Sequence, residues 1–493
     1  MEHVDVLIVG AGLSGVGAAC HLKMECPGKS FVILEGRSAL GGTWDLFRYP
    51  GVRSDSDMYT LGYRFRPWRD AKAIADGPAI LNYIRETAAE FGVDKTIRYG
   101  HRVRRASWSS DDACWTVEAE AGPEQTAVSF TCNFLYLCTG YYDYEGGYTP
   151  EWPGVEGFGG LVVHPQKWPE DLDYTGKRVV VIGSGATAVT LVPAMAERAA
   201  HVTMLQRSPT YVVARPAEDG IANWLRRRLP AGAAYALTRW KNVLVGMFFY
   251  ALARRRPETF KRLVAKGVKN QLGGQYDLKH FTPRYDPWDQ RLCLVPDSDL
   301  FRTIREGKAS VVTDHIETFT ETGLRLKSGE HLDADIVVTA TGLVLRLMSG
   351  MQLLVDGAPL DMPQKLVYKG MMYSDVPNLA FAIGYTNASW TLKCDLTAEY
   401  VCRLLKHMDR HGYALCAPRL NDPEVREEPV IDFNSGYVQR ALDTLPKQGS
   451  KTPWRLHQNY VKDLTMMRFG NLEDGVMEFR AAPARRGAAL TLS

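Results

Sequence analysis

The sequence predicts an α/β protein built from two Rossmann-type dinucleotide-binding units, with a mostly helical insertion in the second unit. Two observations support this fold class. The chain opens with a strand, a glycine-rich turn and a helix, and the same order returns near residue 178. No short-period repeat or low-complexity tract interrupts this pattern. A chain of 493 residues is long enough for roughly two to four domains and for enclosed ligand sites.

The first unit begins with a β-branched strand at 5–9, followed by a G-x-G-x-x-G turn at Gly10, Gly12 and Gly15. The first glycine permits the tight turn, the second lets a pyrophosphate approach the backbone, and the third lets the helix pack on the strand. Glu35 ends the next strand, where a carboxylate accepts hydrogen bonds from a ribose hydroxyl. Because an acid there repels a 2′-phosphate, this unit is expected to bind FAD or NAD.

The second unit repeats the pattern after the strand 178–182, with Gly183 and Gly185, but has Ala188 as its third small residue. Arg207 stands at the end of the next strand, where the first unit has an acid. A guanidinium at that place pairs with a 2′-phosphate, although an ordinary surface arginine is the alternative. The two units together predict a flavin that is reduced by NADPH. Since no close cysteine pair exists to relay electrons, we expect oxygen, a quinone or another protein as the acceptor.

The composition is that of an ordinary globular protein, with 45% hydrophobic and 23% charged residues. The 59 Lys and Arg nearly balance the 56 Asp and Glu, for a net charge of +3. Because phosphate backbones require a clear basic excess, we expect no nucleic-acid partner. The nine cysteines are an odd number without a C-x-x-C pair. We therefore expect a reducing, cytoplasmic compartment, and neither a disulfide framework nor a bound metal.

No secretory signal or membrane span is expected. Residues 1–5 contain two acids and no Lys or Arg, and the apolar run at 6–9 is too short for a signal core. The longest apolar stretch with helical spacing, 243–253, is shorter than the roughly 20 residues that span a bilayer. The chain is therefore expected to be soluble or at most peripheral at a membrane, and the sequence leaves its oligomeric state open.

The domain boundaries follow from changes in pattern along the chain. Residues 141–160 are rich in Gly, Pro and Tyr, which is typical of a linker, and the strand at 378–384 is expected to return the chain to the first sheet. The expected division is a FAD-binding domain in two parts (1–142 and 369–493, the second with the C-terminal region), linkers at 143–160 and 346–368, an NADP-binding domain in two parts (161–214 and 281–345), and a helical insertion at 215–280.

The insertion is electrically unlike the rest of the chain. Residues 215–270 contain 13 Lys or Arg and only three acids. Two arginine triplets, 226–228 and 254–256, flank the apolar run 243–253. One interpretation is a basic amphipathic helix at an anionic lipid surface, with peripheral membrane contact through 215–270. The alternative is a helical lid whose apolar face packs on its own domain and whose basic face is solvated.

Two longer motifs carry a family resemblance. Residues 158–169 fit F-x-G-x-x-x-H-x-x-x-W-P, and residues 41–55 fit G-G-x-W-x-x-x-x-Y-P-G-x-x-x-D, each without a mismatch. On these motifs the chain resembles the type I Baeyer–Villiger monooxygenases, a group of class B flavoprotein monooxygenases, and in particular their ethionamide-activating branch. Flavin-containing monooxygenases that oxidise amines have a similar first motif, but with a different ending in place of Trp-Pro. The residues that carry the fingerprint are Phe158, Gly160, His164, Trp168 and Pro169.

The resemblance implies an NADPH- and O2-dependent enzyme with FAD that oxidises ketones to esters through a C4a-peroxyflavin, and that also oxidises thioethers at sulfur. Its substrates would be O2 and a small-molecule ketone or thioether. Two alternatives remain: an amine- or sulfur-oxidising flavin-containing monooxygenase, and an uncoupled NADPH oxidase.

The resemblance also assigns roles to single residues. Arg291 matches the catalytic arginine that stabilises the peroxide anion, with a structural salt bridge to Asp289 or Asp297 as the alternative. Asp55 matches the partner of that arginine, with a helix N-cap as the alternative. His164 is expected to couple NADP binding to domain rotation rather than to transfer protons. Many relatives have a lysine just before the catalytic arginine, but this chain has Gln290, so the preference for NADPH would depend mainly on Arg207.

The residues expected to bind the two cofactors follow from the glycine turns and from the two family motifs. A helix beginning near 387–391 is expected to point its N-terminus at the flavin. The expected cofactor-binding residues are Gly10, Gly12, Ser14, Gly15, Glu35, Gly42, Thr43, Trp44, Asp55, Met58, Tyr59, Gly183, Ser184, Gly185, Ala186, Thr187, Arg207, Ser208, Thr341, Gly342 and Asn387.

Overall fold

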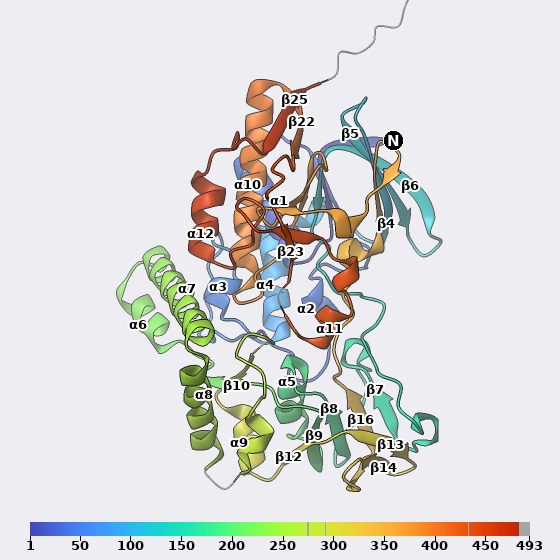
Figure 1. Cartoon of the computed structure of the whole chain (residues 1–493), viewed down its shortest axis with the longest axis vertical. Helices are drawn as coiled ribbons and strands as arrows, with labels where there is room; N and C mark the ends of the chain where they lie inside the picture. The colour runs from blue at the N-terminus through green and yellow to red at the C-terminus, as the bar shows by residue number, and fades with distance from the viewer. Residues whose placement is uncertain (274–275, 291, 432, 483–493) are drawn as a thin grey trace, which may run out of the picture.

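The computed structural model describes residues 1–273, 276–290, 292–431 and 433–482, and shows two sheet-centred units joined by a helical segment on one side (Figure 1). The sequence is expected to form buried parallel strands where β-branched residues run without alternation, because helices cover both faces of such a sheet. Strands β1 and β8 have this character, and each is buried along most of its length.

The first unit is organised by a nine-stranded mixed sheet. Its parallel part has the order β3-β2-β1-β6. Strand β21 pairs in parallel with the last residues of β6, so the chain does return to this sheet after the second unit. The antiparallel pairs β4–β5 and β5–β6 extend it. The strands are β1 (Glu2–Val9), β2 (Phe31–Leu34), β3 (Ile97–Arg98), β4 (His101–Ser109), β5 (Cys114–Ala121), β6 (Thr126–Leu137), β17 (Gln352–Val355), β18 (Ala358–Pro359) and β21 (Leu379–Phe381).

The segment 346–368 is not the plain linker that we expected. It contributes β17, which pairs in parallel with β4, and β18, which pairs with β17 at the edge of the first sheet. The chain therefore re-enters the first unit before residue 352. The short length of these strands, and the glycine and proline beside them, explain why the sequence pattern resembles that of a linker.

The second unit contains a five-stranded parallel sheet with the order β12-β9-β8-β16-β7. Helices α5 (Ala186–Met195) and α9 (Asp299–Arg305) pack beside it, and a three-stranded antiparallel sheet and a two-stranded pair complete the unit. Its strands are β7 (Leu161–Val163), β8 (Arg178–Ile182), β9 (His201–Gln206), β10 (Val212–Arg215), β11 (Cys293–Pro296), β12 (Ala309–Thr313), β13 (Ile316–Thr320), β14 (Gly323–Leu326), β15 (His331–Asp333) and β16 (Ile336–Thr339).

The helices of the first unit cover its sheet. Helix α1 follows the first glycine turn and lies beside α10, and the two form the largest helix–helix contact of this unit (Figure 1). The helices are α1 (Leu13–Glu25), α2 (Thr43–Leu46), α3 (Met58–Leu61), α4 (Gly77–Glu90), α10 (Trp390–His411), α11 (Gly436–Gln439) and α12 (Tyr460–Leu464), the last continued by a π-helical turn at Thr465–Phe469. Short strand pairs complete the C-terminal region: β19 (Val367–Tyr368), β20 (Met372–Tyr373), β22 (Tyr413–Pro418), β23 (Glu427–Pro429), β24 (Lys447–Gly449) and β25 (Met477–Ala481).

The helical insertion consists of α6 (Gly220–Arg228), α7 (Ala231–Arg255) and α8 (Pro257–Leu272). Helix α8 packs on α9 and β10 of the second unit, whereas α7 packs on α3 of the first unit. The buried Arg239 of α7 donates to the carbonyl oxygens of Tyr59 at 2.8 Å and Gly62 at 2.9 Å. The insertion thus bridges the two units, and our alternative of a lid confined to its own domain is wrong on this point. No helix within the described ranges is long and apolar enough to cross a bilayer.

The motif 41–55 joins the two units directly. Phe47 and Tyr49 belong to the buried cluster of the second unit, although the neighbouring helix α2 belongs to the first. A Cβ on Gly51 would lie 2.7 Å from the Cβ of Ala194 in α5, so only glycine allows this close approach. Arg53 forms an ion pair with Asp299 at the start of α9. The motif therefore fixes the distance between the two glycine turns.

Candidate functional site

The first glycine turn is tightly packed. Gly10 has φ +103°, and a Cβ there would lie 2.6 Å from the carbonyl oxygen of Cys138. A Cβ on Gly15 would overlap the carbonyl oxygen of Gly10. Gly42 approaches the turn from α2, and its Cβ position is 3.0 Å from the Cα of Gly12. These glycines keep a side-chain-free surface where a dinucleotide can lie against the backbone.

A cavity of about 820 Å³ opens at this turn, and we refer to it as the dinucleotide cavity. Glu35 lies in its wall, where its carboxylate accepts hydrogen bonds from the backbone of Ala11 at 2.7 Å and of Arg37 at 2.9 Å. Burial raises the pKa of Glu35 despite these bonds. The carboxylate is thus held at the end of β2, the place from which it can bind a ribose hydroxyl. The cavity is lined by Gly10, Gly12, Glu35, Arg37, Gly42, Arg102, Thr139, Tyr142, Tyr144 and Arg346, among others.

Arg37 is a site residue that the sequence reasoning missed. Its guanidinium forms an ion pair of 2.7 Å with the buried Asp45 and stands over the ring of Tyr144. Asp45 also pairs with Arg48 at 2.9 Å and Arg85 at 3.5 Å. An arginine on the wall of the cavity is placed where it could also pair with a pyrophosphate. Its position two residues after Glu35 was the only available signal.

The second glycine turn has the same local geometry but lies open. Gly183 has φ +139°, and a Cβ there would overlap the carbonyl oxygen of Ala340. Gly185 and Ala186 are exposed, and no heavy atom lies within 4 Å of a Cβ placed on Gly185. Ala188 is buried on α5. The turn therefore presents a free backbone surface at the N-terminus of α5, which suits a phosphate group.

The side chains around the second turn are polar. The Ser184 hydroxyl lies 2.8 Å from that of Thr210 and donates to the carbonyl oxygen of Ser208 at 3.1 Å. Arg207 and Ser208 are exposed at the end of β9. The ion pairs found among the described residues do not include Arg207, so its guanidinium is available to an anionic ligand. Thr187 faces the hydroxyl of Tyr49, whose pKa burial raises to about 12.

The fingerprint 158–169 forms the edge strand β7 and the turn after it. Phe158 packs edge-on against Phe319, and a Cβ on Gly160 would overlap the carbonyl oxygen of Asp335. Trp168 packs on the buried cluster of the second unit, while Pro169 is exposed. These residues fix the start of the second sheet and lie outside the dinucleotide cavity.

His164 of the fingerprint holds the linker in place. Its imidazole lies so close to Gly147 that a Cβ there would overlap the ring. The neighbouring Gln166 donates to the carbonyl oxygen of Asp143 at 2.7 Å, and Thr341 donates to that of Tyr148 at 2.6 Å. Burial lowers the pKa of His164, so the ring is neutral near pH 7. These contacts attach residues 143–148 to the second sheet.

The remaining predicted residues differ in their placement. Asp55 is exposed and accepts a hydrogen bond of 3.5 Å from Ser56. The N-cap of α3 is Asp57, which accepts from the backbone of Thr60, so our N-cap alternative for Asp55 is wrong. Arg291 lies outside the described residues. Of the two residues that we gave as its alternative partners, Asp289 pairs with Arg254 at 2.8 Å and Asp297 accepts from the backbone of Ala217 at 2.9 Å.

The other residues predicted to bind a cofactor do not all line one of the two cavities. Thr43 and Trp44 lie on α2, directly after Gly42. Met58 and Tyr59 are buried on α3 and are not among the described residues that line either cavity. Asn387 donates to the carbonyl oxygen of Gln458 at 3.0 Å, and its own side-chain oxygen is buried without a partner in the structure. Gly342 accepts a backbone hydrogen bond from Tyr148 at 3.0 Å.

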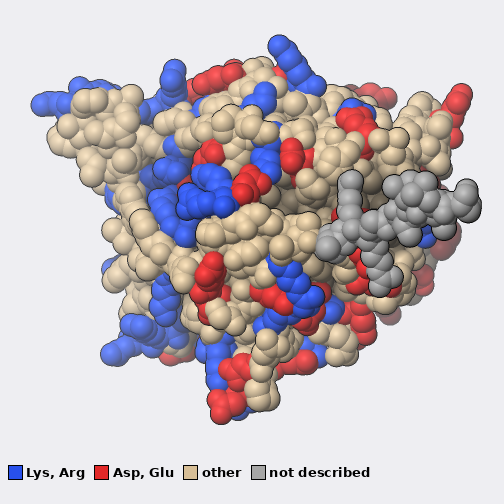
Figure 2. Space-filling view, turned by 90° about the horizontal axis from the view of Figure 1, so that it is seen from above, with Lys and Arg blue, Asp and Glu red and all other residues tan. Residues whose placement is uncertain are grey.

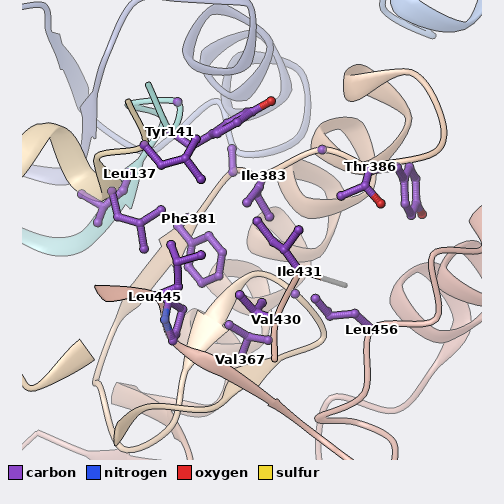
Figure 3. Close-up of a pocket in the computed structure, with 18 of the residues that line it drawn as sticks. Leu137, Tyr141, Val367, Phe381, Ile383, Thr386, Val430, Ile431, Leu445 and Leu456 are labelled. Carbon is purple, nitrogen blue, oxygen red and sulfur yellow. The ribbon is translucent and has the colours of Figure 1, made fainter. Parts of the chain in front are cut away.

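A second cavity lies beside the N-terminus of α10, which begins at Trp390 and so fits the expected helix start (Figure 3). It measures about 1050 Å³, including space open to solvent, and we refer to it as the apolar cavity. None of its described lining residues is charged. Thr139, just after β6, lines both cavities, so the two spaces lie next to each other at this residue. The lining includes Leu137, Tyr141, Leu347, Val367, Phe381, Ile383, Thr386, Val430, Ile431, Leu445 and Leu456.

An aromatic pair separates the apolar cavity from α1. The rings of Tyr141 and Trp390 stack with centroids 5.1 Å apart. The indole nitrogen of Trp390 donates to the Ser14 hydroxyl at 2.8 Å, which joins the start of α10 to the start of α1. The two helices whose N-termini would border a flavin are therefore fixed relative to each other.

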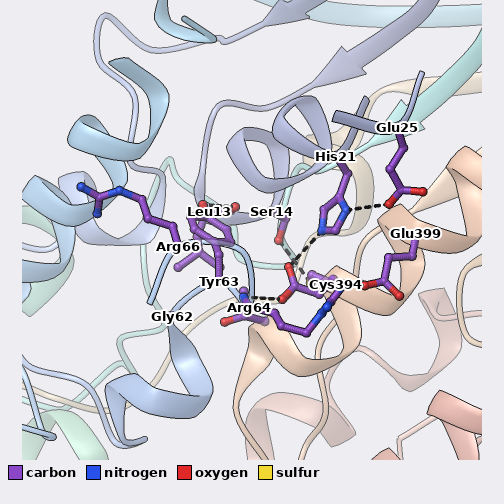
Figure 4. Close-up of polar contacts among 12 residues, drawn as sticks. Leu13, Ser14, His21, Glu25, Gly62, Tyr63, Arg64, Arg66, Cys394 and Glu399 are labelled. Atoms are coloured by element: carbon purple, nitrogen blue, oxygen red, sulfur yellow. Dashed lines mark hydrogen bonds and ion pairs between the residues drawn. The ribbon is translucent and has the colours of Figure 1, made fainter. Parts of the chain in front are cut away.

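A buried charged network holds α1 against α10 (Figure 4). His21 lies 3.4 Å from Asp395 and 3.3 Å from Glu25. Burial disfavours the imidazolium, but the hydrogen bonds to Asp395 and Glu25 outweigh it and raise the pKa of His21 to about 9. Asp395 also accepts from the backbone of Arg64 at 3.0 Å, and its pKa is lowered by His21 although burial acts in the opposite direction. At neutral pH this is a cation–anion pair inside the first unit.

Comparison with known proteins agrees with this geometry. Residues 72–406 match the model of the flavin-binding monooxygenase-like family, and residues 8–72 match an NAD(P)-binding Rossmann-like domain. The chain is 55% identical over 488 residues to the FAD-containing monooxygenase EthA of Mycobacterium tuberculosis, covering 99% of each chain. It is 53% identical over 480 residues to EthA of Mycolicibacterium smegmatis, covering 97% of each. The chain belongs to the flavin-binding monooxygenase-like family, and the prediction of a flavin-dependent monooxygenase is confirmed.

The fold is also found among solved structures. An oxidised steroid monooxygenase bound to NADP superposes with a TM-score of 0.76 at 22% identity, covering 97% of this chain and 100% of that one. The prediction of an α/β fold with Rossmann-like dinucleotide-binding units is therefore confirmed.

Proposed function

We propose that this protein is an NADPH- and O2-dependent Baeyer–Villiger monooxygenase that oxidises neutral, apolar ketones to esters. FAD would occupy the dinucleotide cavity, NADPH would bind at the second glycine turn, and the ketone would bind in the apolar cavity. The observation that supports this proposal best is that the dinucleotide cavity and a second cavity, whose described lining residues are uncharged, share Thr139 in their walls.

The residues present fit FAD at the first turn. The glycines leave room for a pyrophosphate against the backbone, Glu35 offers a carboxylate to a ribose, and Arg37 brings a positive charge to the cavity wall. The N-termini of α1 and α10 both approach this region through Ser14 and Trp390, and helix N-termini stabilise negative charge. A reduced flavin carries such charge.

The second turn fits NADPH better than NADH. Gly185 and Ala186 leave the N-terminus of α5 open to phosphates, and Arg207 with Ser208 stands exposed where a 2′-phosphate would lie. The openness of this turn suits a cofactor that must enter and leave in each catalytic cycle.

The lining of the apolar cavity favours a neutral substrate. A protonated amine would find no carboxylate among the described lining residues, and burying an unpaired cation is costly. The described part of the lining therefore suits a ketone better than an amine. A thioether is as neutral as a ketone, so sulfoxidation is the second candidate activity of the same cavity.

When bound and reduced by NADPH, FAD supplies the activation of O2 that both reactions need. The chain's own residues exclude water and hold charge. The aliphatic and aromatic lining of the apolar cavity keeps water from the reacting centre. Arg291 would stabilise developing negative charge, and Asp55 would orient its guanidinium.

The test is NADPH oxidation by the purified yellow protein with and without 2-octanone, with the products identified by gas chromatography. Turnover stimulated by the ketone, with ester as product, would support the proposal. Arg291→Ala should then retain flavin reduction and lose ester formation. A thioether that is oxidised when 2-octanone is not would favour the second candidate, and hydrogen peroxide as sole product with both compounds would contradict both.

A further inference from the structure

Helix α7 has apolar residues on two opposite faces. Its inner face carries the buried Tyr235, Arg239 and Val243, which pack on the first unit. Its outer face carries Leu237, Trp240, Leu244 and Phe248, which are 41–63% exposed. Their spacing of three and four residues places these four side chains in one stripe, opposite the buried face. A soluble protein with no other use for that face would be expected to have polar residues there.

Further exposed apolar side chains lie on the neighbouring helix α6 and near the end of α7. Ile221 and Trp224 on α6 are exposed by 58% and 57%, and α6 packs directly on α7. Phe249 adds a further exposed ring beside Phe248. We refer to the outer stripe of α7 together with Ile221, Trp224 and Phe249 as the outer apolar surface. Exposed apolar stripes such as that of α7 mark interaction sites.

Arginine residues lie at both ends of the outer apolar surface. The triplet 226–228 ends α6 next to the start of α7, and the triplet 254–256 forms the last residues and C-cap of α7, directly before α8. Seen from above, Lys and Arg side chains gather on the left of the molecule, the side from which α6 and α7 project in Figure 1 (Figure 2). Helix α7 has 25 residues and so is about 37 Å long, with cationic groups at each end.

The few acids of this segment are turned to their own partners. Asp219 pairs with Lys241, and Glu258 pairs with Lys261 at 2.8 Å. Glu218 accepts from Asn223 at 3.0 Å. The surface is thus apolar in its middle, cationic at its ends and poor in available anions.

We propose that the outer apolar surface docks on an anionic phospholipid bilayer, with α7 lying in the plane of the interface. Tryptophan and phenylalanine enter the boundary between headgroups and acyl chains, and arginines bind lipid phosphates. A second copy of this chain is disfavoured as the occupant, because two such surfaces brought together would juxtapose like-charged arginine triplets. The proposal does not depend on which reaction the enzyme catalyses.

The test is flotation of the FAD-loaded enzyme with vesicles of phosphatidylcholine alone or of equal parts phosphatidylcholine and phosphatidylglycerol. We expect binding to the anionic vesicles to be at least about tenfold tighter, because each Lys or Arg near an anionic surface adds to the attraction. Equal binding to both vesicle types, or no flotation at all, would overturn the proposal.

Two variants separate the apolar and the cationic contributions. The first variant combines Leu244→Ser with Phe248→Ser. The second replaces Arg227, Arg228, Arg255 and Arg256 together by Glu. Each variant should bind anionic vesicles about tenfold more weakly or worse. Both should keep their flavin, thermal unfolding temperature and NADPH oxidation. The matched controls are Phe469→Ser, at a side chain 71% exposed elsewhere, and a fourfold Glu replacement at the exposed cations Lys95, Lys177, Lys327 and Arg410.

The controls decide between a specific surface and general stickiness. Unchanged binding in both control variants, together with loss in the two test variants, would support the proposal. Equal losses in a control and its test variant would overturn it. Light scattering without lipid measures the oligomeric state of the same variants. If Leu244→Ser/Phe248→Ser changes the oligomeric state and leaves vesicle binding intact, the surface would be assigned to a second copy of the chain instead.

Discussion

The two glycine turns share a spacing but differ in their surroundings. The first is enclosed: Ala11 and Gly15 are buried, Glu35 lies in the wall of a cavity, and α10 and α2 approach from two sides. The second is open: Gly185, Ala186 and Arg207 are exposed. The same local motif thus builds a site suited to a resident cofactor in one unit and a site suited to an exchanging cofactor in the other. The segments that enclose the first turn, such as α10, come from distant parts of the chain.

The helices after the two turns are also held differently. Helix α1 is fixed to α10 by the buried pair of His21 and Asp395. Helix α5 is held by apolar packing, with Val189, Leu191 and Val192 buried in the cluster of the second unit. The attachment of α1 is therefore expected to weaken at alkaline pH more than that of α5.

The largest expected effect comes from Gly15→Ala. The second turn already has Ala188 at the equivalent position, yet a Cβ on Gly15 would overlap the carbonyl oxygen of Gly10. We expect this variant to lose its flavin, measured as the ratio of flavin to protein absorbance after purification. Gly185→Ala is the matched control, because a Cβ there meets no atom within 4 Å, and it should stay yellow. A fully flavinated Gly15→Ala protein would contradict the tight packing of the first turn.

The second prediction concerns alkaline pH. Since the folded protein raises the pKa of His21 from 6.5 to about 9, the stabilisation from this group is fully present below pH 6.5 and is lost as the pH rises through 9. The expected loss is about 3 kcal/mol of unfolding free energy. Hydrogen exchange should show α1 losing protection between pH 7 and 9.5 before α5 does.

His21→Gln is the control for that experiment. It removes the titrating group, so its unfolding free energy should be lower than that of the wild type at pH 7 and should change less towards pH 9.5. Parallel pH profiles for the two proteins would show that His21 is not the group responsible.

The third prediction tests the charge difference between the two turns. Arg207→Ala should raise the KM for NADPH by about 10- to 100-fold, because a hydrogen-bonded ion pair with a phosphate contributes about 1.5–3 kcal/mol. The KM for NADH should stay within about twofold, since NADH lacks the 2′-phosphate, and steady-state kinetics with both nucleotides provides the comparison. An equal rise for NADH would place Arg207 at another part of the nucleotide.

The glycine turns and their charged partners could be predicted from the sequence because each is local. Gly10 to Gly15 and Gly183 to Ala188 each lie within one strand–turn–helix. Glu35 and Arg207 follow the third small residue of their turns by 20 and 19 residues. The start of the helix expected near 387–391 was also predicted from the sequence, since α10 begins at Trp390.

The apolar cavity could not be predicted, because its walls come from segments far apart in the chain. Leu137 is the last residue of β6, Leu347 lies in the crossing between units, and Ile431 and Leu456 belong to the C-terminal region. For α7, apolar residues all around the helix gave no periodicity that could tell the buried face from the exposed one. The cap of α3 depended on a shift of two residues, from Asp55 to Asp57, which is finer than a sequence pattern defines.

The smallest expected effect distinguishes two roles for Thr341. We predicted that this residue binds a cofactor, and the structure shows its hydroxyl donating to the carbonyl oxygen of Tyr148 in the linker at 2.6 Å. If Thr341 acts by holding the linker, Thr341→Val should lower the unfolding free energy by about 1 kcal/mol and change the KM for NADPH by less than about threefold. Thr339→Val, which removes a longer hydrogen bond of 3.3 Å to Val163 in the same sheet, is the matched control. A rise of about tenfold in the KM for NADPH in Thr341→Val alone would mean that the hydroxyl binds the nucleotide. The nucleotide site at the second turn would then include a residue that also contacts the linker. The second site would be more enclosed, and so more like the first, than the exposure of Gly185, Ala186 and Arg207 indicates.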